Sequence, residues 1–418
     1  MKGSLWTGCC QRTISRCEAA LRLSQTLRGW LAAVLLIPVI GPQRSWGQYL
    51  ITDVGTFGGS FSSADGISAA GVVVGLASLP GDATWRTYRL DAGVMQDLGL
   101  PASSSVSKID DTGGIIGTLW GRYGERSSFL VRGGTMVTVP ITELRGVNAA
   151  GTVVGASPFG GLSQHAYSYA DGNTIDLGTF GGGFARAHGI NDLGQIVGQS
   201  SNSAGEVRAF LYEAGVMQDI GDLGGGYASA SAINNSGQVT GQSTTPGGAV
   251  VPFLYKAGAM FELPPVEGLP GSYDPTSING HGVVVGSSHT LGAGQLAWIH
   301  IDGVTRDLNS LIPAESGWRL VGASDINDAG QIVGSGYLNG DLRGYVLTLI
   351  PEPESWALAA GALLCAACLL RHAPGCPAGG WACGMKGSRR GLVTPTVAEP
   401  PGRNRKEPAR RGGRQTLD

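Results

Sequence analysis

An acidic side chain recurs at one position in most of the internal repeats of this chain. Six of seven repeat units place Asp or Glu at the end of their last predicted strand, and the remaining unit has Thr138. Repeated carboxylates can bind calcium, but calcium needs its oxygen ligands at about 2.3–2.6 Å, and equivalent positions on separate units lie far apart. We therefore predict no metal site, and we expect the charges to discourage edge-to-edge pairing of the outermost strands. The acids are Asp53, Asp97, Asp176, Asp219, Glu262 and Asp307.

Other groups that could perform catalysis are few and are not repeated. Residues 48–350 contain no cysteine, and their histidines have no motif partners, whereas catalysis needs a convergent acid, base or nucleophile. We predict no catalytic residues, no cofactor and a non-enzymatic protein. Because two carboxylates suffice for glycoside hydrolysis, a carbohydrate-active hydrolase or lyase with acids in a central cleft stays the alternative. The histidines are His165, His188, His281, His289 and His300.

Aromatic and glycine-rich segments offer further candidate sites. Trp85, Trp120, Trp298 and Trp318 could stack on sugar rings, although core packing is the favoured interpretation. Gly-Thr-Phe-Gly-Gly occurs at 55–59 and at 178–182. Both copies lack the Lys-Ser/Thr of a phosphate-binding loop, so we expect them to bring backbones close together instead.

Composition indicates short strands and tight turns. Glycine makes up 70 of the 418 residues, and charged residues are only 14%, against about 25% in typical domains. This composition excludes coiled coils, long helical bundles and charged disordered chains. Residues 49–370 hold 13 basic and 27 acidic side chains, so the main body would repel phosphate backbones, and we predict no nucleic-acid partner for it.

A ten-residue sequence motif, with forms such as GINDLGQIVG and DINDAGQIVG, occurs seven times. Its second residues are spaced by 42, 38, 43, 43, 45 and 48 positions. The third residue can start a turn through its side-chain oxygen, and the glycine three residues later can close a hairpin loop in a left-handed conformation. These turn residues are Ser68, Asp110, Asn148, Asn191, Asn234, Asn279 and Asn327.

A period of 40 to 45 residues fits four short strands with their turns, as in a propeller blade. The body contains seven candidate third strands but only six fourth strands after them. Residues 50–55 resemble the missing strand and precede the first repeat. We predict an all-β, seven-bladed β-propeller of four-stranded blades over residues 48–350, closed by this N-terminal strand against residues 344–350. A β-solenoid is the alternative architecture.

The units resemble bacterial extracellular HAF repeats, named for a His-Ala-Phe triplet. The triplet occurs here in varied form as His165-Ala166-Tyr167 and Arg208-Ala209-Phe210. The resemblance covers about 300 residues and seven copies. It implies an exported β-repeat protein and no specific reaction.

The N-terminal 47 residues have the three parts of a secretory signal peptide. Arg22 and Arg28 precede an eleven-residue apolar run, residues 30–40, which predicts a signal helix. Small residues precede a cleavage site between Gly47 and Gln48. A buried core helix is the alternative interpretation of the apolar run.

Residues 351–372 resemble the PEP-CTERM sorting signal of Gram-negative bacteria. Pro351, Glu352 and Pro353 precede a fifteen-residue apolar run, which we expect to form a hydrophobic, membrane-associated helix, and Arg371 follows it. The resemblance implies recognition by an exosortase-type membrane protease and delivery to the cell surface or an exopolysaccharide matrix. The chain departs from the family by continuing to residue 418, and we expect residues 373–418, rich in Arg, Pro and Gly, to be disordered. A nucleic-acid-binding role is the alternative for this tail.

These observations favour an exported structural or binding module that presents loops to a polysaccharide or to surface proteins. We expect it to be anchored in the membrane before processing and to reside afterwards at the cell surface or in the matrix.

Overall fold

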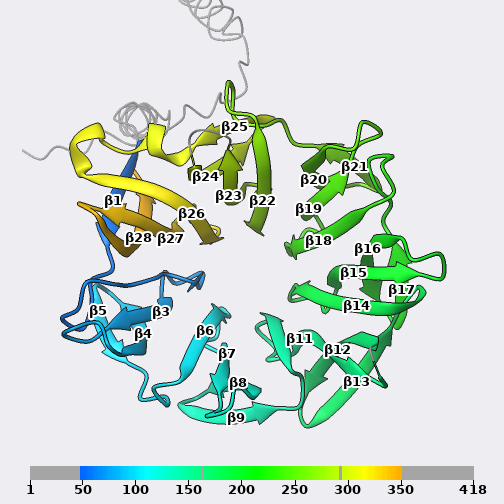
Figure 1. Ribbon diagram of the computed structural model, residues 1–418, viewed down its shortest axis with the longest axis horizontal. Coiled ribbons are helices and arrows are strands. Elements are labelled where there is room, and N and C mark those ends of the chain that lie inside the picture. Colours follow the sequence, from blue (N-terminus) through cyan, green and yellow to red (C-terminus); the bar gives the residue numbers. More distant parts are fainter. Residues whose placement is uncertain (1–47, 162, 291–293, 351–418) are drawn as a thin grey trace, which may run out of the picture. The chain divides into compact units, whose positions relative to one another are not determined.

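The computed structural model describes residues 48–161, 163–290 and 294–350, which form an all-β β-propeller (Figure 1). Antiparallel sheets follow one another around a ring, with the first strand of each repeat innermost. The helices found in these residues are two short 3-10 turns, η1 (Leu308–Leu311) and η2 (Ala314–Ser316). The predicted signal helix, the hydrophobic helix and the basic tail lie outside the described residues.

Four repeats each form a separate sheet from consecutive strands. The first contains β2 (Gly66–Ile67), β3 (Val73–Ser78), β4 (Trp85–Asp91) and β5 (Val94–Asp97). The second contains β6 (Ser104–Ile109), β7 (Ile115–Trp120), β8 (Arg126–Arg132) and β9 (Thr135–Val139). The fifth contains β18 (Ala228–Ile233), β19 (Val239–Thr244), β20 (Val250–Lys256) and β21 (Ala259–Glu262). The sixth contains β22 (Gly271–Ile278), β23 (Val284–Thr290), β24 (Gly294–Ile301) and β25 (Val304–Asp307).

The third and fourth repeats share one eight-stranded sheet, which corrects the prediction of seven separate blades. One half contains β10 (Glu143–Val147), β11 (Val153–Phe159), β12 (Ser163–Ala170) and β13 (Asn173–Gly178). The other half contains β14 (Gly181–Ile190), β15 (Ile196–Asn202), β16 (Val207–Glu213) and β17 (Val216–Asp219). Gln164 of β12 pairs in parallel with Phe184 of β14. The halves join because only Thr179 and Phe180 separate β13 from β14, so β14 starts early and runs beside β12.

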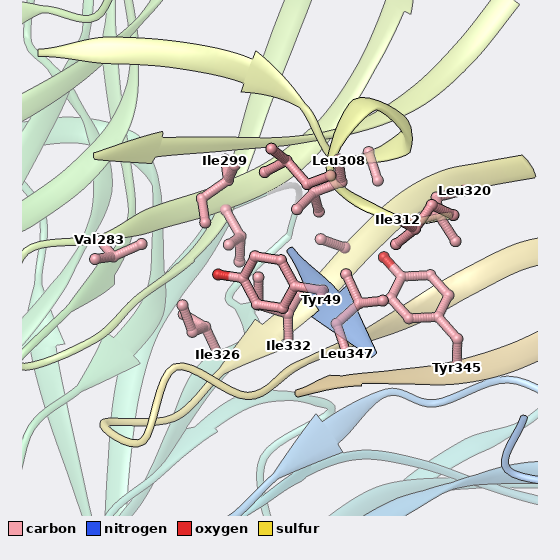
Figure 2. Packing of buried hydrophobic residues seen from close by; sticks show 14 residues of the cluster. Tyr49, Val283, Ile299, Leu308, Ile312, Leu320, Ile326, Ile332, Tyr345 and Leu347 are labelled. Carbon is pink, nitrogen blue, oxygen red and sulfur yellow. The ribbon is translucent and has the colours of Figure 1, made fainter. Parts of the chain in front are cut away.

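The seventh repeat is completed by the start of the body. It contains β26 (Trp318–Ile326), β27 (Ile332–Leu338) and β28 (Asp341–Leu349), and β1 (Tyr49–Asp53) pairs antiparallel with β28 as its fourth strand. The predicted closure of the ring by an N-terminal strand is therefore confirmed. In Figure 2, Tyr49 lies among buried side chains of the sixth and seventh repeats, and this burial raises the pKa of its phenol to about 12.

Burial explains the apolar runs of the second strands. In β3, β7, β11, β15, β23 and β27, two consecutive Val or Ile residues point to opposite faces and are both buried. Each sheet is therefore covered on both faces by its neighbours, as the sequence predicted.

A glycine faces an aromatic residue in every repeat. Each second strand contains a glycine paired with an aromatic residue of the third strand. A Cβ at any of these glycines would lie 1.9–2.1 Å from a carbonyl oxygen of the first strand or, for Gly75, of Ser63 just before that strand. Only glycine therefore allows the first and second strands to approach this closely. The pairs are Gly75–Tyr88, Gly117–Phe129, Gly155–Tyr167, Gly198–Phe210, Gly241–Phe253, Gly286–Trp298 and Gly334–Tyr345.

The turn asparagines also link neighbouring repeats. In each of them Oδ1 accepts hydrogen bonds from its own turn, for example from Leu193 N and Gln195 N to Asn191. Nδ2 donates to a backbone carbonyl of the next repeat. The bonds are Asn148 to Asn191 O, Asn191 to Asn234 O, Asn234 to Asn279 O, Asn279 to Asn327 O and Asn327 to Ser68 O, at 2.8–3.1 Å.

A second, exposed set of contacts runs beside the asparagines. The side chain after the turn residue accepts a hydrogen bond from a backbone amide of the preceding repeat. The donors and acceptors are Ala69 N with Asp111, Ala149 N with Asp192, Asp192 N with Asn235, and Gly280 N with Asp328. The Asn-Asp and Asp-Asp pairs of the sequence thus join repeats as well as form turns.

Four of the outer-strand acids bind a backbone amide near the end of their strands and pair with a basic side chain. Asp53, Asp97, Asp176 and Asp219 each accept a hydrogen bond from the backbone amide two residues later. Their other partners lie on the adjacent third strand, at the position of the histidine in the triplet. These pairs are Asp53–Arg343, Asp97–Arg86, Asp176–His165 and Asp219–Arg208.

The close approach at the paired glycines predicts a large effect of one methyl group. We expect Gly198→Ala to destabilise the fold by about 1–3 kcal/mol or more, because its Cβ would lie 1.9 Å from Arg186 O and 2.9 Å from the ring of Phe210. The measurement is the urea midpoint of unfolding. Gly183→Ala is the matched control, because that Cβ would meet only Ser163 Oγ, at 3.5 Å. Equal midpoints for the two variants would contradict the packing argument.

Asp110 interrupts the series of asparagines and predicts a stabilising change. Its Oδ1 accepts from Gly114 N, and its buried Oδ2 has no hydrogen-bond partner among the described residues. Asparagine would place an N–H group there, toward the backbone of the third repeat, so Asp110→Asn should raise stability by about 1 kcal/mol. The reverse change, Asn191→Asp, should lower it. Calorimetric unfolding of both variants is the measurement, and a lower midpoint for Asp110→Asn would refute this prediction.

Candidate functional site

The two faces of the ring carry different connections. Turns between first and second strands, and between third and fourth strands, lie on one face, which we call the turn face. Hairpins between second and third strands lie on the opposite face, which we call the mouth face. A cavity of about 950 Å³ opens there, lined by the first strands and by hairpin residues such as Trp120 and Arg126.

In six repeats a β-bulge in the first strand turns one side chain into this cavity. The strand register skips one residue in β6, β10, β14, β18, β22 and β26, two positions before the repeated Ile or Val. A bulge changes the direction of a side chain and is common beside functional sites. Together with the equivalent Asp65, the skipped residues form a set that we call the collar. The collar is Asp65, Ser107, Arg145, His188, Ser231, Thr276 and Ser324, and all seven line the cavity.

Hydroxyl groups dominate the rest of the lining. Ten of the 26 lining residues are Ser or Thr, and the charged residues are three acids and three bases. The acids are Asp65, Glu143 and Asp274, and the bases are Lys108, Arg126 and Arg145. A neutral cavity rich in hydroxyls offers many directional hydrogen bonds without a strong net field. Such a lining suits an uncharged, polyhydroxylated ligand.

Lys108 is neutralised at the edge of the collar. Its Nζ lies 2.8 Å from Asp325 Oδ1, and the buried Asp325 also accepts hydrogen bonds from Ser277 Oγ and Ile67 N. Asp65 lies close enough to be influenced by the Lys108 charge. Burial nevertheless raises the pKa of Asp65 to about 6, with a hydrogen bond from Ser63 and the Lys108 charge acting against it. Asp65 can therefore donate or accept a proton near neutral pH.

His188 is held as a neutral acceptor. Its Nδ1–H donates to Ala230 O at 2.8 Å, which leaves Nε2 unprotonated. Burial, aided by the positive charges of Arg145 and Arg186, lowers its pKa to about 4, although the hydrogen bond to Ala230 O and the Glu143 charge act in the opposite direction. Because folding lowers this pKa, His188 contributes stability above pH 6.5 that is lost as the pH falls toward 4.

Glu143 and Arg145 form a loose pair on β10. Arg145 Nη2 lies 3.6 Å from Glu143 Oε2, and that buried oxygen has no hydrogen-bond partner among the described residues. An unsatisfied buried acceptor favours a donor from a ligand. On the cavity wall, Arg126 lies 4.5 Å from the ring centre of Trp120, which is 42% exposed.

A smaller cavity of about 210 Å³ opens on the turn face. It shares Lys108, Arg145, His188, Ser231 and Thr276 with the mouth cavity. These side chains therefore separate the two cavities along the centre of the ring.

The residues singled out from the sequence fall in several places. The outer-strand acids lie on the rim of the ring, away from the mouth cavity, and His188 and His289 line that cavity. Trp298 is fully buried, Trp318 packs on the core, and Trp85 and Trp120 are exposed. Gln48 precedes β1, and its carbonyl accepts from Ile350 N. Gly47 and the motif Pro351, Glu352, Pro353 and Arg371 lie outside the described residues.

Sequence reasoning missed the collar. The signal was present, because the position two residues before the repeated Ile or Val is polar in all seven units. The sequence alone does not show that these side chains point into one cavity, because their direction depends on the bulge, and no residue type indicates a bulge at this position. In the part of the chain that the structure describes, no group of three or more His, Cys, Asp or Glu side chains is placed to hold a metal ion. Nor does that part contain a helix with the length and apolar character needed to cross a bilayer.

Comparisons with known proteins give structural likenesses only. No family model matches the chain, and no characterised protein matches it in sequence. It is similar to the β-propeller domain of the trilobed protease from Pyrococcus furiosus, at 11% identity over 58% of this chain and 82% of that one, with a TM-score of 0.45. TolB from Acinetobacter baumannii is 13% identical over 53% of this chain and 61% of that one, with a TM-score of 0.39. The acylaminoacyl peptidase from Pyrococcus horikoshii is 14% identical over 57% of this chain and 44% of that one, with a TM-score of 0.41. The chain thus spans less than two thirds of the last two proteins, and none of these likenesses bears on its activity.

The raised pKa of Asp65 predicts a pH-dependent gain of stability. Because folding raises this pKa from 3.8 to about 6, the buried carboxylate destabilises the fold progressively as the pH rises through that range. We expect Asp65→Asn to raise the thermal midpoint at about pH 7.5 and to change it little near pH 4. Asp171→Asn, in an exposed turn, is the control. A gain that is equal at both pH values would contradict the assignment.

Proposed function

We propose that this protein is an exported, non-enzymatic binding module that holds a neutral glycan in the mouth cavity. The carrying observation is the collar, which turns one polar side chain from every repeat into a cavity rich in hydroxyl groups. Sugar hydroxyls can exchange hydrogen bonds with this lining, and the exposed ring of Trp120 can stack on the apolar face of a sugar.

The ring gives this site a rigid frame. Seven four-stranded repeats, two of which share one sheet, surround the cavity. In our proposal the units are HAF-type repeats, and all seven contribute to the same site.

Export follows from the sequence motifs at the two ends. We propose that the signal peptide is cleaved between Gly47 and Gln48 and that residues 351–372 anchor the chain in the membrane. An exosortase-type protease would then recognise Pro351, Glu352, Pro353 and Arg371 and release the body to the cell surface or an exopolysaccharide matrix. There the mouth cavity would meet polysaccharide or surface proteins.

One observation favours a carbohydrate-active hydrolase or lyase as a second candidate. Asp65, with its pKa raised to about 6, and Glu143 line the same cavity. Glycoside hydrolases use two carboxyl groups, one as a general acid and the other as a base or nucleophile. Release of reducing ends from a bound polysaccharide, abolished in Asp65→Asn, would favour this candidate over simple binding.

The binding proposal predicts a specific role for Trp120. We expect Trp120→Ala to weaken glycan affinity about tenfold, because it removes the stacking surface and about 1.4 kcal/mol of interaction. Affinity is measured by titration calorimetry with neutral oligosaccharides from the extracellular matrix of the producing organism. Phe261→Ala, which removes an exposed ring on the outer strand β21 and outside the cavity lining, is the control. If the wild-type protein binds none of these oligosaccharides, the proposed function is wrong.

A further inference from the structure

Exposed aromatic side chains gather at one kind of position in this fold. The described residues include six exposed aromatic side chains. Five of them lie in hairpins between second and third strands, either in the connection or at the strand end beside it. These hairpins all lie on the mouth face. The five are Trp85, Trp120, Tyr123, Phe159 and Tyr337, and the sixth, Phe261, lies on the outer strand β21.

The five side chains belong to consecutive repeats. Tyr337 lies in the seventh repeat, Trp85 in the first, Trp120 and Tyr123 in the second, and Phe159 in the third. The seventh repeat adjoins the first, as the hydrogen bond from Asn327 Nδ2 to Ser68 O shows. The aromatic residues therefore follow an arc along one side of the cavity. Hairpins of the fourth and fifth repeats have Ser-Ala-Gly and Pro-Gly-Gly at their tips instead.

Three of these rings are supported by a cationic or imidazole neighbour. Arg126 lies over Trp120, and Arg319 lies 5.3 Å from the ring centre of Tyr337. His165 stacks on Phe159 with ring centres 3.9 Å apart and an interplanar angle of 13°. His165 is in turn held by Asp176. A supported ring keeps a fixed orientation, which lowers the entropy lost when a ligand stacks on its other face.

The chemistry of the arc favours a sugar polymer over other macromolecules. The rings lie on four separate hairpins, with Trp120 and Tyr123 sharing one, so they do not form one continuous apolar patch of the kind that binds proteins. The acidic body would repel a nucleic acid. Sugar chains present an apolar face and a hydroxyl edge at every unit, which matches isolated rings beside a hydroxyl-lined cavity.

We infer that the mouth face carries an extended track for a neutral polysaccharide chain, running from the cavity along the aromatic hairpins of the seventh, first, second and third repeats. The inference rests on the proposed function, because the cavity holds one segment of the same chain. Tyr123, 86% exposed, and Phe159 do not line the cavity, so they contact only segments beyond it. Affinity should therefore increase with the length of the glycan.

The test uses the full chain and the neutral polysaccharide fraction of the matrix made by the producing organism. Partial acid hydrolysis and size fractionation provide a series from disaccharides to long oligomers. We expect affinity to rise by about tenfold or more from short to long oligomers, as linked weak sites add to a primary one. The double variant Tyr123→Ala and Phe159→Ala should lose this rise and keep the affinity for short oligomers.

Control variants separate the possible outcomes. Phe261→Ala removes an exposed ring that also has a cation nearby, Lys256 at 5.5 Å, and it should leave the whole series unchanged. Equal affinity for short and long oligomers would overturn the track while the cavity proposal stands. Absence of binding at every length would overturn both. Loss of binding after protease treatment of the matrix fraction would identify a protein partner and overturn the polysaccharide assignment.

Discussion

The hydrogen bond from each turn asparagine to the next repeat fixes how the sheets meet around the ring. Its acceptor is a backbone carbonyl, so the bond specifies the position of the neighbouring first strand as well as its presence. The donor Nδ2 is buried, which makes loss of the bond more costly than at the surface. The same bond from Asn327 to Ser68 joins the seventh repeat to the first across the closure of the ring. The alignment of the first strands, and with it the shape of the central cavity, depends on this series.

The cavity chemistry follows from that alignment. In six repeats a bulge turns one residue toward the centre, and the fixed strands bring these residues to one level. The repeats otherwise conserve the same packing, with an aromatic residue opposite a glycine, so the collar position is free to vary. It holds an acid, a base, an imidazole and four hydroxyls. A repetitive scaffold thereby supports a site in which no two neighbouring repeats contribute the same residue.

Local patterns made much of the fold predictable. The repeated ten-residue motif predicts the hairpins, and the unmatched strand near the N-terminus predicts the closure by β1. Both predictions succeed because each depends on a short stretch of sequence. The joined sheet of the third and fourth repeats depends on a two-residue connection and on where β14 begins, which no motif records. The collar was missed for a similar reason, since the polar character of Asp65 or His188 gains its meaning only from the bulge beside it. The contact of the second side chain of each turn, such as Asp192, cannot be predicted from local sequence, because its partner lies 43 residues away.

Closure by β1 also decides how the ring responds to tension. Tyr49 pairs with Leu349, and Gln48 O accepts from Ile350 N, so the chain enters and leaves the body at the same end of this strand pair. A force that pulls residues 48 and 350 apart loads the hydrogen bonds between β1 and β28 one after another instead of all together. The first to break are those nearest the load, and each rupture exposes the next. Under such a pull the ring should open at the seventh repeat, at low force, while the other repeats keep their structure.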